Sequence, residues 1–162
     1  MSVGEIMTRR VITVPPEMSV RDLARLLATR RISGAPVVDA EGRLVGVVSE
    51  ADLTRLVART RGHEMEPSET PPFYLDAWIE THAERIPFLL EELVPQRLTV
   101  ADIMSRQVIC VGVDTSLQEA IDTMLTRRIH RLIVTDTAGT VVGILTTVDL
   151  LRCFQSRLPA PV

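Results

Sequence analysis

Two short motifs place a hydroxyl and a carboxylate three residues apart, and the motifs themselves lie 97 positions apart. Ser49 precedes Asp52, and Thr146 precedes Asp149. In a capping box, the hydroxyl of the first residue accepts a hydrogen bond from a free N–H at the helix start. The acidic side chain three residues later accepts one from the N–H of the first residue. The same groups can bind a ligand, because a carboxylate accepts two hydroxyl donors and a helix start favours an anion. The spacing alone leaves capping and ligand binding both open.

Motifs typical of an enzyme or a metal site are absent from the sequence. It contains no GxSxG nucleophile elbow, no GxxxxGK[ST] phosphate loop, no HExxH zinc motif and no GxGxxG loop. The three histidines and two cysteines show no metal-ligand spacing. We therefore expect a non-catalytic protein that has no metal and no cofactor.

The chain repeats itself without a gap. Residues 3–57 align with residues 100–154, and 20 of the 55 aligned pairs are identical. A gapless internal repeat of this length predicts two copies of one structural unit. The two hydroxyl–carboxylate motifs fall at corresponding positions of the two copies.

Each copy has the hydrophobic periodicity of a β-α-β-β-α unit. In the first copy, residues 11–14 form a β-branched run, which indicates a strand. After Ser19, apolar residues follow at the i, i+3, i+4, i+7 spacing of a helix. Two apolar strands at 35–38 and 44–48 flank a turn, and a second helix begins at Ser49. The second copy predicts the same order, with its first strand at 108–111.

A unit of about 55 residues buries little surface by itself. We therefore expect an α+β fold in which two repeats pack sheet to sheet around a pseudo-twofold axis. The expected boundaries are 1–59 for the first repeat, 60–99 for an insert, 100–157 for the second repeat and 158–162 for a tail.

The insert differs in composition from the repeats. Residues 60–72 are polar and indicate a loop. Apolar residues then return at helical spacing up to residue 94, and Pro87 can open a second helix. Four of the five aromatic residues lie in this short helical insert: Phe73, Tyr74, Trp78 and Phe88. We expect them to cover an apolar surface, and contact with a partner subunit is the alternative.

Composition narrows the class of protein. The formal net charge is −3 at pH 7, and no apolar run is long enough to span a membrane. An acidic chain lacks the excess positive charge with which proteins bind a nucleic-acid duplex. The N-terminus has no signal peptide, and the two cysteines form no CxxC pair. We expect a soluble cytoplasmic protein with reduced thiols that contacts neither a nucleic-acid duplex nor a membrane.

Three segments recur in both copies in the same order. They are Ile6-Met7, residues 32–38 (ISGAPVV) and residues 46–53 (GVVSEADL), and then Ile103-Met104, residues 129–134 (IHRLIV) and residues 143–150 (GILTTVDL). Together they resemble the CBS (cystathionine β-synthase) domain pair, or Bateman module, over nearly the full length of both copies. The resemblance implies adenosine-containing ligands bound in clefts between the copies, and a signal passed to an attached or associated protein.

The resemblance also implies which residues line the two clefts. Each aspartate would accept hydrogen bonds from ribose hydroxyls, the adjacent hydroxyl and helix start would face a phosphate, and the other copy would supply an apolar slot for the base. The first cleft would combine Asp149, Thr146 and Ile144 with Ile12, Ile32 and Ser33. The second would combine Asp52, Ser49 and Val47 with Ile109, Ile129 and His130. Simple core packing is the alternative for the isoleucines.

The two clefts are not chemically equal, because His130-Arg131 stands where the first copy has Ser33-Gly34. The planar guanidinium of Arg131 suits phosphate oxygens. It would favour a multiply charged ligand in the Asp52 cleft.

These observations support three functional hypotheses. The first is a stand-alone regulatory module that binds AMP, ADP or ATP as a regulatory ligand, forms a homodimer and signals to an unknown effector protein. The second is a ligand-free protein-interaction or dimerisation module whose aromatic insert docks another protein. The third is a module that binds S-adenosylmethionine or a dinucleotide in place of a mononucleotide.

Overall fold

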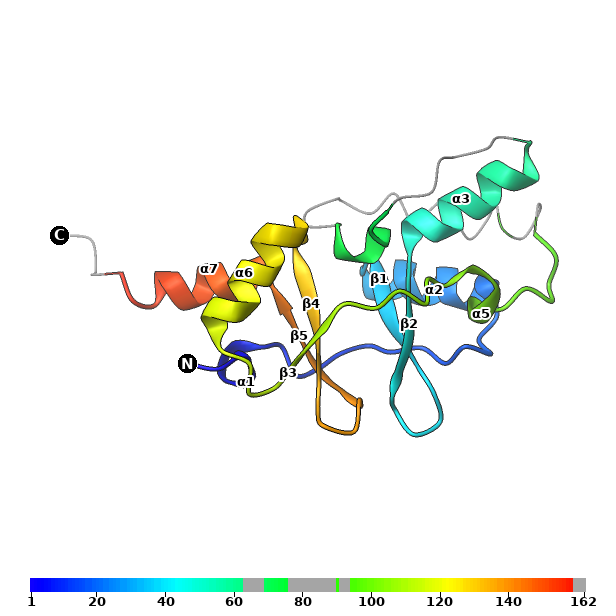
Figure 1. Ribbon diagram of the computed structural model, residues 1–162. Coiled ribbons are helices and arrows are strands. Elements are labelled where there is room, and N and C mark those ends of the chain that lie inside the picture. The colour runs from blue at the N-terminus through cyan, green and yellow to red at the C-terminus, as the bar shows by residue number, and fades with distance from the viewer. Residues whose placement is uncertain (63–68, 76–89, 91–93, 159–162) are drawn as a thin grey trace.

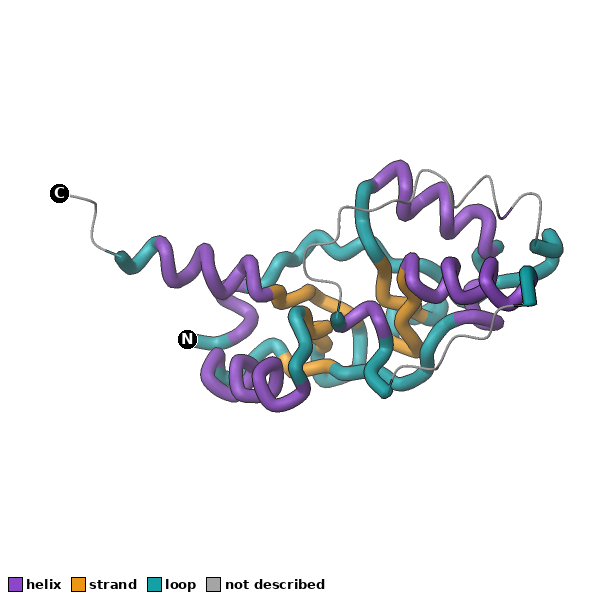
Figure 2. Tube along the Cα trace, turned by 90° about the horizontal axis from the view of Figure 1, so that it is seen from above, coloured by secondary structure: helices purple, strands orange, loops and turns teal. Residues whose placement is uncertain are grey.

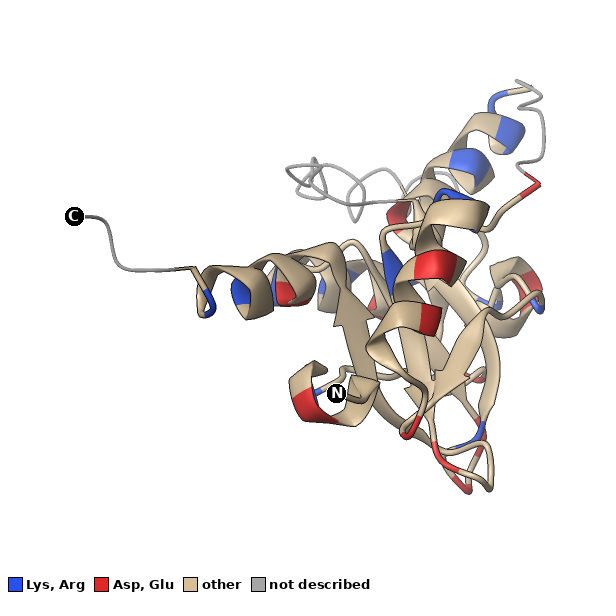
Figure 3. Ribbon diagram, turned by 60° about the vertical axis from the view of Figure 1, so that its left-hand side comes forward, with Lys and Arg blue, Asp and Glu red and all other residues tan. Residues whose placement is uncertain are grey.

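The computed structural model describes residues 1–62, 69–75, 90 and 94–158, which form an α+β fold with two sheets. The strands lie in the middle of the molecule, and the longer helices of the two repeats lie toward its two ends (Figure 2). Charged residues gather on the helices and the hairpin turns, whereas the strands carry few (Figure 3). The predicted α+β class with two repeats is confirmed.

The first repeat begins with a short helix and follows the predicted order from the first long helix onward. Its elements are α1 (Val3–Ile6), α2 (Val20–Arg30), β1 (Gly34–Val38), β2 (Leu44–Ser49) and α3 (Glu50–Thr60). Ser19 caps α2, since its hydroxyl accepts from the N–H of Asp22 at 3.1 Å. The buried residues of α2 recur at the predicted helical spacing: Val20, Leu23, Ala24 and Leu27.

The second repeat has the same helices and the same hairpin in the same order, and one more strand before its first long helix. Its elements are α5 (Val100–Ile103), β3 (Cys110–Gly112), α6 (Leu117–Arg127), β4 (Arg131–Thr135), β5 (Val141–Thr146) and α7 (Thr147–Gln155). Ser116 caps α6 as Ser19 caps α2. Helices α2 and α6 both end at an arginine in the left-handed conformation, Arg31 with φ 52° and Arg128 with φ 53°. Corresponding residues therefore adopt the same unusual backbone.

Strands β1 and β2 form one antiparallel hairpin, and β4 and β5 form the corresponding hairpin beside it (Figure 1). Strand β3 adds to the second hairpin in parallel with β4. The predicted strand at 11–14 is reduced to a single bridge from Val14 to Val37. Pro15 and Pro16 follow at once and have no N–H to extend the pairing. The predicted strand at 108–111 is shifted and begins only at Cys110.

The start of each repeat crosses to the other repeat. Thr8 and Ile144 of β5 exchange two backbone hydrogen bonds of 2.9 Å, and Ser105 and Val47 of β2 do the same. Helix α1 accordingly contacts α7, and α5 contacts α3. The expected domain boundaries describe the sequence, but in space the two repeats are interleaved.

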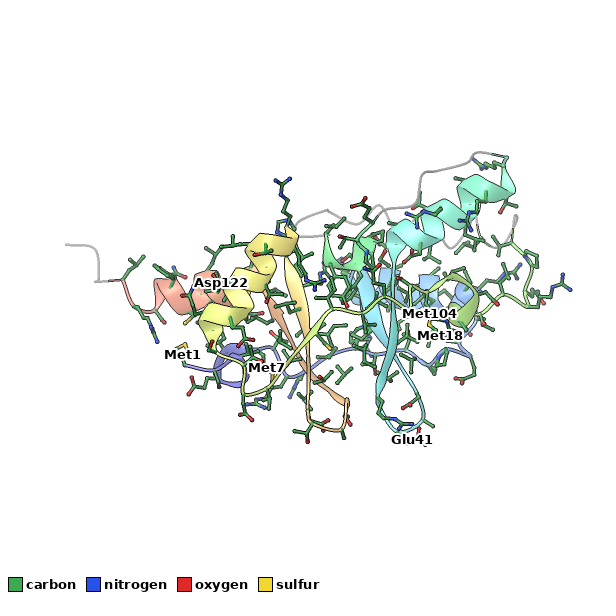
Figure 4. All side chains as sticks on the ribbon, in the orientation of Figure 1. Met1, Met7, Met18, Glu41, Met104 and Asp122 are labelled. Atoms are coloured by element: carbon green, nitrogen blue, oxygen red, sulfur yellow. The ribbon has the colours of Figure 1, made fainter. Side chains whose placement is uncertain are left out.

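This crossing explains two of the repeated glycines. Met7 lies against Gly143, and Met104 lies against Gly46, so each methionine packs on the other repeat (Figure 4). A Cβ atom at Gly46 would lie 2.8 Å from Met104 Sδ and 2.8 Å from the carbonyl oxygen of Ser105. The crossing segments therefore require a residue without a side chain on the strand beneath them.

Only part of the insert falls within the described residues. A 3₁₀ turn, η1 (Pro72–Tyr74), contacts β2 and α3. Phe73 and Tyr74 are buried, and so is Leu90, which confirms for these residues that the insert covers an apolar surface. Trp78, Phe88 and the helix predicted from Pro87 lie outside the described residues.

Candidate functional site

Both predicted capping boxes are present. Asp52 Oδ2 accepts from the N–H of Ser49 at 2.8 Å and from its hydroxyl at 3.1 Å. Asp149 Oδ2 accepts from the N–H of Thr146 at 2.8 Å and from its hydroxyl at 2.7 Å. Each carboxylate is 8% exposed. One oxygen of each aspartate is thus committed to its own helix start, and the other oxygen, Oδ1, faces away from that bond.

The other oxygen of Asp149 is reached by a residue that the sequence analysis did not single out. The hydroxyl of Thr8 donates to Asp149 Oδ1 at 3.2 Å. Thr8 arrives there because its backbone pairs with Ile144, two positions before Thr146. Its counterpart in the second copy is Ser105. A hydroxyl at this position in both copies is the sequence feature that could have pointed to Thr8. In the other cleft, Asp52 Oδ1 lies 3.7 Å from Arg55 Nη1.

The first cleft brings residues of both repeats together. Arg131, which pairs with Thr146 across the β4–β5 hairpin, donates to Ser33 Oγ at 3.1 Å and so connects the two sides. The four predicted lining residues Ile12, Ile32, Ser33 and Ile144 are all partly exposed. This cleft therefore has polar and apolar surface that solvent reaches.

Two backbone donors at the first cleft have no acceptor among the described residues, namely the N–H groups of Ile12 and Ser33. The carbonyl of Ser33 is bonded, since it accepts from the N–H of Glu50 at 2.9 Å. The same bond recurs in the second repeat, where the carbonyl of His130 accepts from the N–H of Thr147 at 3.0 Å. The backbone around Ser33 and His130 is therefore equivalent in the two repeats.

The insert fills the part of the second cleft that corresponds to the base slot, whereas Asp52 also borders an open pocket of about 160 Å³. Tyr74 Oη accepts from the N–H of Ile109 at 2.6 Å, and the carbonyl of Tyr74 accepts from the N–H of His130 at 2.8 Å. Phe73 and Tyr74 belong to one apolar cluster with three of the predicted lining residues: Val47, Ile109 and Ile129. These three are 1%, 8% and 3% exposed. Burial raises the pKa of Tyr74 well above its ordinary value, and the N–H of Ile109 opposes this shift.

Arg131 contacts residues of both clefts. Its guanidinium stands 5.0 Å from the centre of the Phe73 ring while it donates to Ser33 Oγ. Arg131 therefore faces the residues of the first cleft and covers the aromatic turn that fills the second. The side chain of His130 is exposed. Sequence reasoning missed this arrangement, because nothing in the spacing tells which partner a guanidinium reaches.

The described residues contain no helix long and apolar enough to cross a membrane. Within the same part of the chain, no three histidine, cysteine, aspartate or glutamate side chains come together as a metal-binding group. Cys110 and Cys153 are free thiols.

Comparison with known proteins gives the same two repeats. A family model for the CBS domain matches residues 3–59 and 100–156. The uncharacterized protein MJ1426 of Methanocaldococcus jannaschii is 32% identical over 155 residues, which cover 92% of each chain. CBSX2, a chloroplastic CBS domain-containing protein of Arabidopsis thaliana, is also 32% identical over 155 residues. That match covers 93% of this chain but only 62% of CBSX2.

Solved structures agree with these matches. The crystal structure of CBSX2 in complex with AMP superposes with a TM-score of 0.68 at 28% identity, and covers 96% of both chains. The cytosolic domain of the Mg²⁺ channel MgtE, in complex with ATP, gives a TM-score of 0.63 at 26% identity, over 94% of this chain and 48% of that one. This protein therefore belongs to the CBS domain family, and its two repeats form a CBS domain pair.

Proposed function

We propose that this CBS pair is a regulatory module that binds an adenine nucleotide in the first cleft, at Asp149. The observation that carries the proposal is the pair of N–H donors at Ile12 and Ser33, which have no acceptor among the described residues. Both residues are partly exposed, so a ligand can reach them, and the ring nitrogens of adenine are acceptors that could take these N–H groups in place of water. The relatives support the choice of ligand, since CBSX2 was crystallised with AMP and the MgtE domain with ATP.

The nucleotide would be held by residues of both repeats. Asp149 Oδ1 accepts one hydroxyl from Thr8 and has a second lone pair for a ribose hydroxyl. Thr146 and the start of α7 favour a phosphate, because the helix start is the positive end of the helix dipole. Ile12, Ile32 and Ile144 offer the apolar surface on which the base would lie.

A ligand that contacts both repeats can act as a regulator. It stabilises the arrangement in which Asp149 and Ser33 face one cleft, and a second protein that prefers this arrangement would then bind more tightly. The effector would be a protein whose affinity for this chain changes when AMP, ADP or ATP is bound.

A homodimer is the second part of the proposal, and the exposed face of α6 and α7 supports it. A groove of about 230 Å³ between these helices is lined by apolar residues that include Leu117, Leu150 and Phe154. Phe154 is 72% exposed, whereas its counterpart in the first repeat, Val57, is 8% exposed and packs in a cluster that contains Leu90 and Val94.

A second copy fits this groove because α7 carries its own apolar stripe. Leu151 and Phe154 of α7 are 62% and 72% exposed, and Leu158, just past the end of the helix, is 63% exposed. A twofold contact would place the stripe of each copy in the groove of the other. Sedimentation analysis should give a dimer for the wild type and a monomer for Phe154→Glu. A monomeric wild type, or a Phe154→Glu variant that stays dimeric, would contradict this interface.

Thermal melting with AMP, ADP, ATP, S-adenosylmethionine and NAD tests the ligand. At 100 times the dissociation constant, binding stabilises the folded chain by about 2.7 kcal/mol. For a chain of this size, that corresponds to a rise in Tm of roughly 2 to 4 °C. We expect the rise with an adenine mononucleotide. If Tm rises only with S-adenosylmethionine or NAD, that compound is the ligand and the adenine mononucleotides are not. If Tm rises with none of the five compounds, the result favours a ligand-free interaction module.

Asp149→Asn should reduce the nucleotide-dependent rise, and Asp102→Asn is its matched control. Asp102 accepts from the N–H of Thr99 at 2.8 Å in a capping box of the same geometry, but it lies at the start of α5 and is exposed. Both variants weaken a helix cap, so both should melt earlier without nucleotide. Only Asp149→Asn should respond less to AMP than the wild type. If AMP raises the Tm of both variants equally, Asp149 is not part of the nucleotide site.

A further inference from the structure

We propose that the Phe73–Tyr74 turn is a built-in occupant of the second cleft, so that this chain binds one nucleotide, at Asp149, and none at Asp52. The inference rests on the proposed function, because it concerns how many of the two equivalent clefts a nucleotide can enter. It replaces the expectation from the sequence that both clefts are ligand sites.

Corresponding backbone donors have different partners in the two clefts. Ile12 and Ser33 of the first repeat correspond to Ile109 and His130 of the second, 97 positions later. In the second cleft both N–H groups donate to Tyr74, one to its phenol oxygen at 2.6 Å and one to its carbonyl at 2.8 Å. In the first cleft the corresponding N–H groups have no acceptor among the described residues. Tyr74 thus makes the bonds that a base would have to make.

The apolar slot of the second cleft is buried, whereas that of the first cleft is partly exposed. Phe73 and Tyr74 are 1% and 0% exposed, and their rings meet edge to face with centroids 5.1 Å apart. They pack with Val47, Ile109 and Ile129, all nearly inaccessible to solvent. The counterparts of these three residues at the first cleft are partly exposed. The flat aromatic rings therefore take the apolar surface that would otherwise receive a base.

Positions 34 and 131 correspond in the two repeats, and both lie close to Phe73. A Cβ atom at Gly34 would lie 2.6 Å from the carbonyl oxygen of Val48 and 2.9 Å from Phe73 Cδ2, so strand β2 and the turn both exclude a side chain there. The corresponding residue of the second repeat is Arg131, and its guanidinium lies over the Phe73 ring, 5.0 Å from the ring centre. A residue without a side chain in one repeat and an arginine in the other therefore accommodate the turn between them.

Calorimetric titration with AMP tests the inference on three forms of the chain: wild type, Asp149→Asn and Asp52→Asn. The two substitutions are matched, because both aspartates cap a helix with the same two bonds and are equally buried. We expect one AMP per chain for the wild type and for Asp52→Asn. Asp149→Asn should weaken binding by about 10- to 100-fold, the effect of a lost hydrogen bond to a charged group.

The outcomes separate the two proposals. Two AMP molecules per chain, or one that is lost in Asp52→Asn and kept in Asp149→Asn, would overturn the built-in occupant and leave nucleotide binding intact. No binding of AMP, ADP or ATP to the wild type would overturn both.

Removal of the turn gives the converse test. The variant Phe73→Ala/Tyr74→Ala should bind a second AMP, and a further Asp52→Asn substitution should abolish that second event only. Circular dichroism checks that the variant is folded; if it is not, the comparison of Asp149→Asn with Asp52→Asn decides the question alone. A folded variant that still binds a single AMP would overturn the role of the turn.

Discussion

The first cleft is bordered by partly exposed isoleucines and two N–H groups with no acceptor among the described residues, whereas the second cleft is packed with Phe73 and Tyr74. Both clefts have the same capping box, with its carboxylate 8% exposed. The difference therefore comes from outside the repeats, from the segment that joins them. Two equivalent sites in a duplicated fold need not remain equivalent once a linker supplies side chains to one of them.

The largest expected effect is on stability at the second cleft. Phe73→Ala removes a buried ring and should lower the free energy of unfolding by about 3 to 5 kcal/mol. Leu75→Ala is the control, because Leu75 lies in the same segment but is 40% exposed. Urea unfolding measures both. If Phe73→Ala costs no more than Leu75→Ala, the turn is not packed in the cleft as described.

Tyr74→Phe should cost less, because the ring remains. The substitution leaves the buried N–H of Ile109 without its acceptor, at a cost of about 1 to 3 kcal/mol in the free energy of unfolding. Urea unfolding of Tyr74→Phe beside the wild type gives this value. A variant as stable as the wild type would mean that the bond from Ile109 contributes nothing.

Tyr74 also predicts a pH dependence. Burial raises its pKa in the folded chain, so the neutral phenol is favoured by folding. Its contribution to stability is fully present below the ordinary pKa of 10.0 and is lost as the pH rises above that value toward the folded-state pKa. Tyr74 is the only tyrosine of the chain, so phenolate absorbance reports on it alone. We expect the native chain to titrate at higher pH than the urea-unfolded chain, and identical titrations would contradict the burial of the phenol.

Arg131→Ala should have a smaller effect that reaches both clefts. The variant loses the contact with the Phe73 ring and the bond to Ser33, together about 1 to 2 kcal/mol of unfolding free energy. Arg131→Lys should recover only part of this, because an ammonium cannot stack as a planar guanidinium does. The exposed Arg127 provides a control, and Arg127→Ala should change stability by no more than about 0.5 kcal/mol. If Arg131→Ala and Arg127→Ala lower the free energy of unfolding equally, the contacts of Arg131 with Phe73 and Ser33 do not stabilise the fold.

The smallest expected effects on stability are at the two helix caps. These caps give a closely matched comparison of the two clefts, because the same kind of residue is changed in each. Ser49→Ala and Thr146→Ala should each cost about 1 kcal/mol, since they remove the same kind of cap. Their effects on AMP affinity should differ, because only Thr146 faces the proposed nucleotide. Chemical unfolding and calorimetry on the same two variants give both quantities. A loss of affinity in Ser49→Ala equal to that in Thr146→Ala would remove the difference between the clefts.

Much of this architecture could be predicted from the sequence, because it is local. The helix at Val20–Arg30, the two hairpins and both capping boxes follow from periodicity and cap residues within a few positions of one another. The crossing of the repeat starts could not be predicted in this way. It depends on Thr8 pairing with Ile144, which is 136 residues away, and no local preference encodes that pairing.

The occupation of the second cleft by the aromatic turn could not be predicted from the sequence for a similar reason. The insert was expected to cover apolar surface, but its position in the second cleft depends on the fit of Phe73 against Gly34 and of Tyr74 against Ile109. The repeat places Arg131 at the Asp52 cleft. In the folded chain its long side chain also reaches Ser33 of the first cleft. Side-chain reach is a tertiary property, and a pattern of residue types does not contain it.

A crystal structure of the chain grown with AMP tests the central claim most directly. The account predicts one nucleotide per chain, with its ribose at Asp149 and its base at the N–H groups of Ile12 and Ser33, and with Phe73 and Tyr74 unmoved. A nucleotide at Asp52 with the aromatic turn displaced, or the absence of nucleotide from the Asp149 cleft at saturating AMP, would contradict it.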